Sequence, residues 1–386
     1  MGAEGAGGYS LDGTKLWVTN GGFADLFTIF ARAPEGFTAF LVPRNAPGLT
    51  LSGEEQKLGL KGSSTRRVFL NDVAVDVGDV IGEVGKGHRP ALYALNAGRF
   101  NIGAIALGGA KEALRIATSY ALNRRQSGRS IAEFGLIADK LAVMAIRIFV
   151  LESMVYRTAG YWDASLGAGV RLAETLEEYA IECAIVKFFG TEVLDYAVDE
   201  CLQIHGGFGY SEEFPAARLY RDARVFRIFE GTNEINRLTV LDQFRRRIER
   251  GRLTLAAPLA STGNDAVDAI RQAACFALGK VLGSAAPQQT IATVADIIAL
   301  LYTLESATLR IERYPSTIGR AIVEAFADRA VQETSTSLRT ALGSVGVPHE
   351  EATSALRPLA DRPLTDTAAL KETIAAQVRD CGGYPL

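Results

Sequence analysis

The 386-residue chain is poor in the residues that bind metals or form disulfide bonds. It has four cysteines and three histidines; no two cysteines form a C-x-x-C motif, and the histidines lie far apart. This distribution indicates neither a disulfide framework nor a zinc site, so we expect no metal centre. An excess of charge of one sign is also lacking, because the formal net charge is -3. We therefore expect small molecules or proteins as partners, not nucleic acid.

Long apolar runs and a signal peptide are missing as well. The first eight residues contain no basic segment followed by an apolar stretch, and charged residues such as Arg99 interrupt the apolar runs before ~18 residues accumulate. Hydrophobic residues are nevertheless abundant, at 48% against 22% charged residues, which is typical of a chain with large buried cores. We expect a soluble protein of a reducing compartment, the bacterial cytoplasm or, in a eukaryote, the mitochondrial matrix.

The sequence pattern predicts an α+β protein in which strands and helices are segregated. Residues 9–82 contain short strand-like runs between Gly, Pro, Asn and Asp breaks, and Asp12-Gly13 predicts a hairpin turn. Later apolar residues recur at helical spacing, which predicts helices near 90–121, 137–159, 170–203, 214–228, 233–249, 265–283, 289–312 and 318–343. The expected domains are a small β domain, an antiparallel helical bundle and an appended C-terminal helical module, at 1–85, 86–250 and 251–386. Because strands and helices do not alternate, a Rossmann fold is disfavoured.

Three segments carry residues that are suited to chemistry. The strand-like run that begins at Trp17 ends in two glycines, which by itself is most simply a core Trp and a turn. Three glycines follow Gln203, and they either admit a phosphate-bearing ligand close to the backbone or cap a helix. Glu230 lies between an apolar helix end and a glycine, where it can act as a general base if burial raises its pKa. The simpler alternative is a solvated Glu230 that pairs with Arg224 or Arg227.

Two further features have simple structural interpretations. His205 is more simply a hydrogen-bonded structural histidine than a catalyst. The basic run 245–247, with Arg250 and Arg252, is more simply a solvated helix C-terminus than a membrane-binding surface. Neither a G-x-S-x-G motif nor a P-loop occurs, so hydrolase and nucleotide-triphosphatase functions lack support.

Taken together, the segments resemble the acyl-CoA dehydrogenases over residues 9–245. The resemblance rests on Q-x-x-G-G-x-G-Y from Gln203, on F-E-G-T-N-E-I around Glu230, on K-L-W-V-T-N-G-G around Trp17 and on G-R-F around Arg99. The spacing of Glu213, Arg218 and Asp222 after Gln203 also matches, and the appended helices resemble the very-long-chain branch.

The resemblance implies an FAD-dependent enzyme that converts a saturated, long-chain acyl-CoA to the trans-2-enoyl-CoA. Electrons would pass to an electron-transferring flavoprotein. Because the family shares its flavin across subunits, a homodimer or larger homo-oligomer is also implied. We expect the appended module to support that dimer rather than to lie on a membrane.

Roles for individual residues follow from the same resemblance. Glu230 falls where the family has its catalytic base, and Arg99 lies behind that carboxylate. The other residues implied in substrate binding are Asn96, Phe229 and Gly231. The residues that match flavin contacts are Trp17, Thr19, Arg124, Gln126, Gln203, Gly207, Thr232 and Glu234.

Two departures from the family pattern bear on function. Ser127 stands where the family usually has Phe, which removes an aromatic contact near the flavin's adenosine. The family's N-terminal helical domain, with its T-E-P…G-S-D signature, has no counterpart, so we expect one wall of the pocket to be missing. A late start of the numbered chain, a separate chain or a true loss would each explain this.

Two other functions therefore stay open. The chain is a non-catalytic subunit or truncated homologue that needs another chain to complete the site, or it is an acyl-CoA oxidase, which passes electrons to oxygen.

Overall fold

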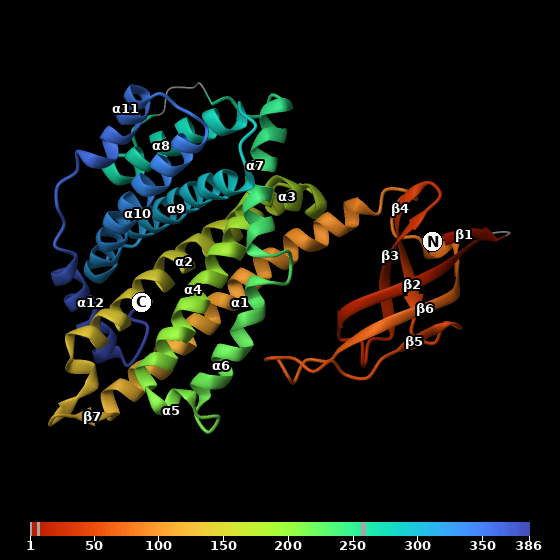
Figure 1. The fold of residues 1–386 in the computed structure, drawn as a ribbon, viewed down its shortest axis with the longest axis horizontal. Coiled ribbons are helices and arrows are strands. Elements are labelled where there is room, and N and C mark those ends of the chain that lie inside the picture. Colours follow the sequence, from red (N-terminus) through yellow and green to blue (C-terminus); the bar gives the residue numbers. More distant parts are fainter. Residues whose placement is uncertain (1, 6–7, 256–259) are drawn as a thin grey trace. The chain divides into compact units, whose positions relative to one another are not determined.

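The protein consists of two compact units, Met1–Leu95 and Asn96–Leu386 (Figure 1). A computed structural model describes residues 2–5, 8–255 and 260–386. Strands occupy most of the first unit, and helices occupy nearly all of the second. The predicted segregation of strands and helices is thus observed, whereas the predicted three-domain boundaries stay a prediction.

The first unit contains a four-stranded antiparallel sheet in the order β1-β2-β6-β5 and a separate hairpin, β3-β4. Alternate residues of β6, among them Val68 and Leu70, are buried against hairpin residues such as Ile29 and Phe40. This alternation is the pattern of a sheet with one face on a core. The strands are β1 (Gly2–Gly5), β2 (Gly8–Thr19), β3 (Leu26–Ala33), β4 (Gly36–Pro43), β5 (Leu49–Leu51) and β6 (Thr65–Asp76).

The hairpin predicted at Asp12-Gly13 is wrong. Strand β2 continues through both residues and pairs with β6, with a shift of register between Leu11 and Gly13. Gly13 has φ of 142°, and the Asp12 carboxylate accepts a hydrogen bond of 2.9 Å from the backbone N–H of Asp72. The dipeptide therefore lies within β2 opposite a β-bulge of β6, where Asn71 and Asp72 face Asp12 and Asp72 has φ of 52°.

The second unit begins with a bundle of long helices. Helix α2 packs on α4, which also contacts α6 and α7. Helices α1 and α4 approach closely, since a Cβ at Gly190 would lie 3.3 Å from the Cα of Gly103. The helices are α1 (His88–Asn123), α2 (Gly135–Gly167), α3 (Leu172–Glu178), α4 (Ala180–His205), α5 (Gly207–Tyr210), α6 (Pro215–Ala223) and α7 (Asn233–Glu249). The short strands β7 (Arg125–Gln126) and β8 (Arg129–Ser130) form a hairpin between α1 and α2.

Two predicted helices are divided in the structure. The helix expected at 170–203 breaks at Tyr179, which ends α3 and precedes α4. The helix expected at 214–228 is α6 followed by a 3-10 turn, η3 (Arg224–Arg227). Apolar periodicity continues across both breaks, so the sequence pattern alone does not reveal them.

The appended module packs on the bundle as part of the same unit. Helix α9 contacts both α2 and α7, and α12 contacts α2, while α10 covers α8 and α9. The module contains α8 (Asp265–Leu282), α9 (Gln288–Arg313), α10 (Thr317–Ser344), α11 (His349–Ala360) and α12 (Thr367–Cys381). Among the described residues, α9 alone is long and apolar enough to cross a membrane, but 61% of its most apolar window is buried inside the protein. We interpret α9 as a core helix of the module.

Candidate functional site

Glu230 stands on an unusual piece of backbone between η3 and α7. Glu230 has φ of 54° and Gly231 has φ of 78°, so two successive residues adopt left-handed conformations. A side chain other than glycine rarely adopts this conformation, which costs of the order of 1 kcal/mol and persists where the surroundings impose it. Thr232 then caps α7, and its hydroxyl accepts a hydrogen bond from the backbone N–H of Ile235.

A buried lysine holds this turn in place. Lys187 on α4 is fully buried, and its Nζ donates to the Gly231 carbonyl at 2.7 Å and to Asn233 Oδ1 at 2.8 Å. The Asn236 amide donates to the same Gly231 carbonyl at 2.8 Å. The sequence analysis did not single out Lys187, although a lone lysine among apolar residues of a buried helix is a signal that could have identified it.

Helix α1 lies directly beside the Glu230 carboxylate. A Cβ at Gly98 would stand only 2.5 Å from Glu230 Oε2, so a larger residue here would displace the carboxylate. Arg99, the next residue, is buried, and its Nη2 lies 3.7 Å from the Cβ position of Gly231. The structure thus brings together Glu230, Arg99 and Gly231, as the resemblance implies.

Glu230 is not the solvated helix-end residue of the simpler alternative. The residue is half-buried, and no hydrogen bond or ion pair to its carboxylate is found in the part of the chain that the structure describes. Arg227 instead pairs with Asp195 at 3.1 Å. The alternative of a pair with Arg224 or Arg227 is therefore wrong.

Burial and two cations act in opposite directions on Glu230. Burial raises the pKa of Glu230, while the positive charges of Arg99 and Lys187 lower it. Burial also lowers the pKa of Lys187 to about 8. A carboxylate with a raised pKa is a stronger base, so this group is suited to removing a proton from carbon.

Asn96 and Phe229 lie next to the Glu230 centre and make different contacts there. The Asn96 side chain accepts a hydrogen bond of 3.1 Å from Arg99 Nη1 and donates one of 3.0 Å to the Leu176 carbonyl. Asn96 thereby orients Arg99 from a buried position. Phe229, directly before Glu230, packs against Phe226 with ring centroids 5.1 Å apart.

A second group of predicted residues meets at the far end of α4. Arg124, Gln126 and Gly207 line a hollow of about 560 Å³. Gly206 caps α4 with φ of 57°, and Gln203 is exposed on the last turn of that helix. Eighteen residues separate Lys187 from His205, which is about 27 Å along a helix. The hollow therefore lies at the C-terminal end of α4, and the Glu230 centre lies beside the first third of that helix.

His205 is held by contacts inside the fold, as the simpler interpretation expects, and it also lines this hollow. The ring is buried, its Nδ1 lies 2.7 Å from the Cys201 carbonyl oxygen, and it stacks on Tyr120 with centroids 4.1 Å apart. Burial lowers the pKa of His205, which favours the neutral form of the ring.

The basic run at the end of α7 is paired with acidic side chains. Arg246 pairs with Asp242 at 3.0 Å, and Arg250 pairs with Glu177 at 3.3 Å. Arg252 lies 3.6 Å from Glu178. These contacts support the interpretation of a solvated helix end.

Trp17 and Thr19 belong to the first unit and are exposed. The Trp17 side chain is 63% exposed, and its backbone has φ of 58° at a shift of register between Lys15 and Val18. The simple interpretation of a core Trp is wrong. Phe23 is also exposed, six residues later in the sequence.

The remaining predicted flavin contacts lie at the start of α7. Glu234 is exposed in the first turn, where hydrogen bonds from its own backbone N–H and from the Thr232 hydroxyl lower the pKa of its carboxyl. Thr232 and Glu234 therefore adjoin Glu230, away from the hollow near Gly207.

Comparisons with known proteins agree on one family. The model described as the acyl-CoA dehydrogenase C-terminal domain matches residues 85–245, and that of the middle domain matches residues 1–73. A probable acyl-CoA dehydrogenase of Bacillus subtilis (strain 168) is 38% identical over 358 residues, which is 84% of this chain and 59% of that protein. The human very long-chain specific mitochondrial acyl-CoA dehydrogenase is 42% identical over 242 residues, 60% of this chain and 35% of that protein.

Solved structures give the same result. The acyl-CoA dehydrogenase of Bacillus anthracis, complexed with FAD, superposes with a TM-score of 0.93 at 35% identity, over 98% of this chain and 72% of that one. The butyryl-CoA dehydrogenase of Megasphaera elsdenii gives a TM-score of 0.58 at 34% identity, over 63% of this chain and 62% of that one. The chain thus spans between about a third and three fifths of the length of the curated relatives named above.

Proposed function

Because this chain belongs to the acyl-CoA dehydrogenase family, we propose that it carries out FAD-dependent α,β-dehydrogenation of a saturated acyl-CoA with Glu230 as the base. The observation that carries the proposal is the Glu230 carboxylate itself. It is half-buried on a left-handed turn, and its pKa is raised.

Glu230 removes the α-proton of the acyl thioester in this proposal. That proton is weakly acidic, so the reaction needs both a desolvated base and donors that stabilise the developing negative charge on the thioester oxygen. The backbone N–H of Glu230 is one such donor. Lys187 and Asn236 both donate hydrogen bonds to the Gly231 carbonyl. These bonds fix the turn, and with it the positions of the Glu230 carboxylate and the Glu230 N–H relative to each other.

The hollow at the end of α4 fits a phosphate-bearing cofactor such as FAD. Arg124 is exposed and has no carboxylate partner among the described residues, and nothing stands within 4 Å of the Cβ positions of Gly206 and Gly207. We propose that Arg124, Gln126, Gln203 and Gly207 hold the pyrophosphate or adenosine side. When bound, the flavin accepts the β-hydride that leaves with the α-proton.

The other predicted contacts would serve the ring end of the flavin. Trp17 would pack on the isoalloxazine and Thr19 would hydrogen-bond to it, while Thr232 and Glu234 adjoin Glu230. Because the hollow lies about 27 Å along α4 from Lys187 at the Glu230 turn, one subunit's hollow would serve a flavin bound beside another subunit's base. This supports a homodimer or larger assembly.

We further propose a long-chain acyl-CoA as substrate and an electron-transferring flavoprotein as electron acceptor. The identity of 42% to very long-chain relatives, against 36% to the short-chain specific enzyme of Megasphaera elsdenii, supports the first part. The appended helices resemble those of the very-long-chain branch, which also supports a long-chain substrate. An acyl-CoA oxidase and a non-catalytic subunit are the competing functions.

The visible spectrum of the purified chain supplied with FAD tests the proposal. Under anaerobic conditions, we expect a bound-flavin band that bleaches when palmitoyl-CoA is added. Glu230→Gln should retain the band but slow its bleaching by ~10³-fold or more, whereas Glu249→Gln, at the exposed end of α7, should behave as the parent chain. Bleaching of Glu230→Gln at the parent rate would contradict the assignment of the base.

The same preparation separates the competing functions. A chain that binds no FAD is a non-catalytic partner or needs another chain to complete its site. Faster turnover with oxygen than with an artificial electron acceptor would instead identify an oxidase.

A further inference from the structure

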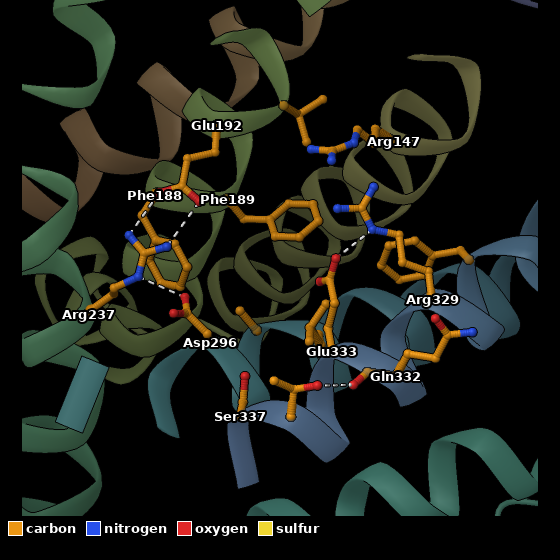
Figure 2. Close-up of a pocket in the computed structure, with 15 residues that line it drawn as sticks. Arg147, Phe188, Phe189, Glu192, Arg237, Asp296, Arg329, Gln332, Glu333 and Ser337 are labelled. Atoms are coloured by element: carbon orange, nitrogen blue, oxygen red, sulfur yellow. Dashed lines mark hydrogen bonds and ion pairs between the residues drawn. The ribbon is translucent and has the colours of Figure 1, made fainter. Parts of the chain in front are cut away.

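A cavity of about 540 Å³ lies where α2, α4 and α7 of the bundle meet α9 and α10 of the module (Figure 2). Its volume is within the range of small-molecule sites, about 300–1,000 Å³. The walls combine apolar side chains with charged ones. The apolar residues include Phe189, Val193, Leu300 and Phe326, and the charged residues are Arg147, Glu192, Arg237, Asp296, Arg329 and Glu333.

The charges at one end of this cavity are fully paired. Arg237 donates to both oxygens of Glu192, at 2.8 and 3.0 Å, and to Asp296 at 2.7 Å. One guanidinium group thus meets two carboxylates, as Figure 2 shows. This end of the cavity has no need of an added anion.

The other end has two guanidinium groups and one carboxylate. Arg329 donates to Glu333 at 2.6 Å, and Figure 2 shows Arg147 on the same side of the cavity. No hydrogen bond or ion pair to Arg147 is found within residues 2–5, 8–255 and 260–386, and its buried Nε has no acceptor. Its guanidinium lies 3.9 Å from the centre of the Tyr196 ring.

Arg147 is therefore a half-buried cation whose buried Nε has no acceptor among the described residues. Burial, together with the positive charge of Arg329, lowers the pKa of Arg147 to about 10. The six charges that line the cavity sum to zero, but they are unevenly distributed, because Arg237 takes two of the three carboxylates. Buried donors without acceptors are costly, and planar guanidinium groups bind carboxylate and phosphate oxygens in pairs.

We propose that this cavity binds a small organic anion, a carboxylate or phosphate monoester on a short apolar body. The oxyanion lies between Arg147 and Arg329, and the apolar body lies against Phe189 and Phe326. Such a ligand contacts helices of both the bundle and the module, so its binding stabilises their packing. This proposal goes beyond the dehydrogenation at Glu230 and does not depend on it.

Calorimetric titration of the full chain with octanoate and with octyl phosphate tests the proposal. We expect saturable binding of at least one probe, which also shows which oxyanion the site prefers. Octanol has the apolar body without the negative charge, and inorganic phosphate has the negative charge without the apolar body. Each should therefore bind about tenfold more weakly or worse.

Variants locate the binding. Arg147→Gln and Arg329→Gln should each weaken it by about tenfold or more, whereas Arg339→Gln, on an exposed part of α10 outside the cavity, should not. If Arg147→Gln fails to fold, Arg329→Gln provides the test, because the Arg329 side chain is 40% exposed. Absence of saturable binding of either probe at millimolar concentration would overturn the proposal. So would binding that is unchanged in the folded variants, because the probes would then occupy another site.

Discussion

At the scale of single residues, the protonation of Glu230 depends on its two cationic neighbours. Burial alone raises the pKa of the carboxyl, and Arg99 and Lys187 oppose that rise. Lys187 also fixes the turn by donating to the Gly231 carbonyl at 2.7 Å. The same lysine therefore acts on both the charge and the position of the proposed base.

Lys187→Gln should shift the pH profile of flavin reduction by acyl-CoA. Glu230 acts as a base only when deprotonated, so activity is lost as the pH falls through its pKa. Removing the cation raises that pKa, and the acid limb should move to higher pH by about half a unit or more. The measurement is the reduction rate against pH; Lys140→Gln, which breaks an ion pair with Glu200 further along α4, should leave the limb in place. An acid limb unchanged in Lys187→Gln would show that the lysine is only structural.

At the scale of elements, glycines of α1 have two different roles. Gly98 faces Glu230, whose Oε2 would lie 2.5 Å from an added Cβ. Gly108, ten residues later on the same helix, is exposed and has nothing within 4 Å of its Cβ position. Of these two glycines, an added methyl group would meet a neighbouring side chain only at Gly98.

Gly98→Ala should lower the rate of flavin reduction by about 10- to 100-fold, because the methyl group displaces the Glu230 carboxylate. Gly108→Ala should leave the rate unchanged and stabilise the helix by about 0.5–1 kcal/mol, since alanine favours a helix over glycine. Reduction rates and melting temperatures of the two variants test this pair of expectations. Equal rates in both would mean that the carboxylate has room to move.

At the scale of the whole helical unit, one carboxylate joins the bundle to the module. Glu152 on α2 is buried and accepts hydrogen bonds from Lys111 on α1, from Arg310 on α9 at 2.8 Å and from Tyr384 near the C-terminus at 2.7 Å. These hydrogen bonds lower the pKa of Glu152 although burial opposes them. The appended helices are thus tied to the bundle through a charged cluster as well as an apolar core.

Glu152→Gln should lower the free energy of unfolding by about 3 kcal/mol, because two cations lose their shared buried partner. Glu112→Gln removes an exposed carboxylate that pairs with Arg115 on the same face of α1, and should cost less than about 0.5 kcal/mol. Urea unfolding of both variants measures the difference. Similar losses of unfolding free energy in the two variants would mean that the Glu152 cluster does not hold the module to the bundle.

The sequence by itself determined the family, the α+β order and most of the proposed Glu230 centre. Glu230 and Gly231 are contiguous in a motif, Arg99 lies in another, and helical periodicity is visible in a single segment. The structure brings Arg99 beside the Glu230 turn, as the resemblance implied. Such features are local in the chain, so a single sequence is enough to indicate them.

Only the tertiary structure decided which distant residues complete these sites. Asp12-Gly13 lies inside a strand opposite a bulge of β6, because β2 continues to pair with β6, and Lys187 contacts Gly231, 44 residues away in the sequence. The anion cavity joins Arg147 to Arg329 across helices that are far apart in the sequence. The physical reason is the same in each case: long-range packing selects the partner of a buried polar group, and no local pattern records that choice.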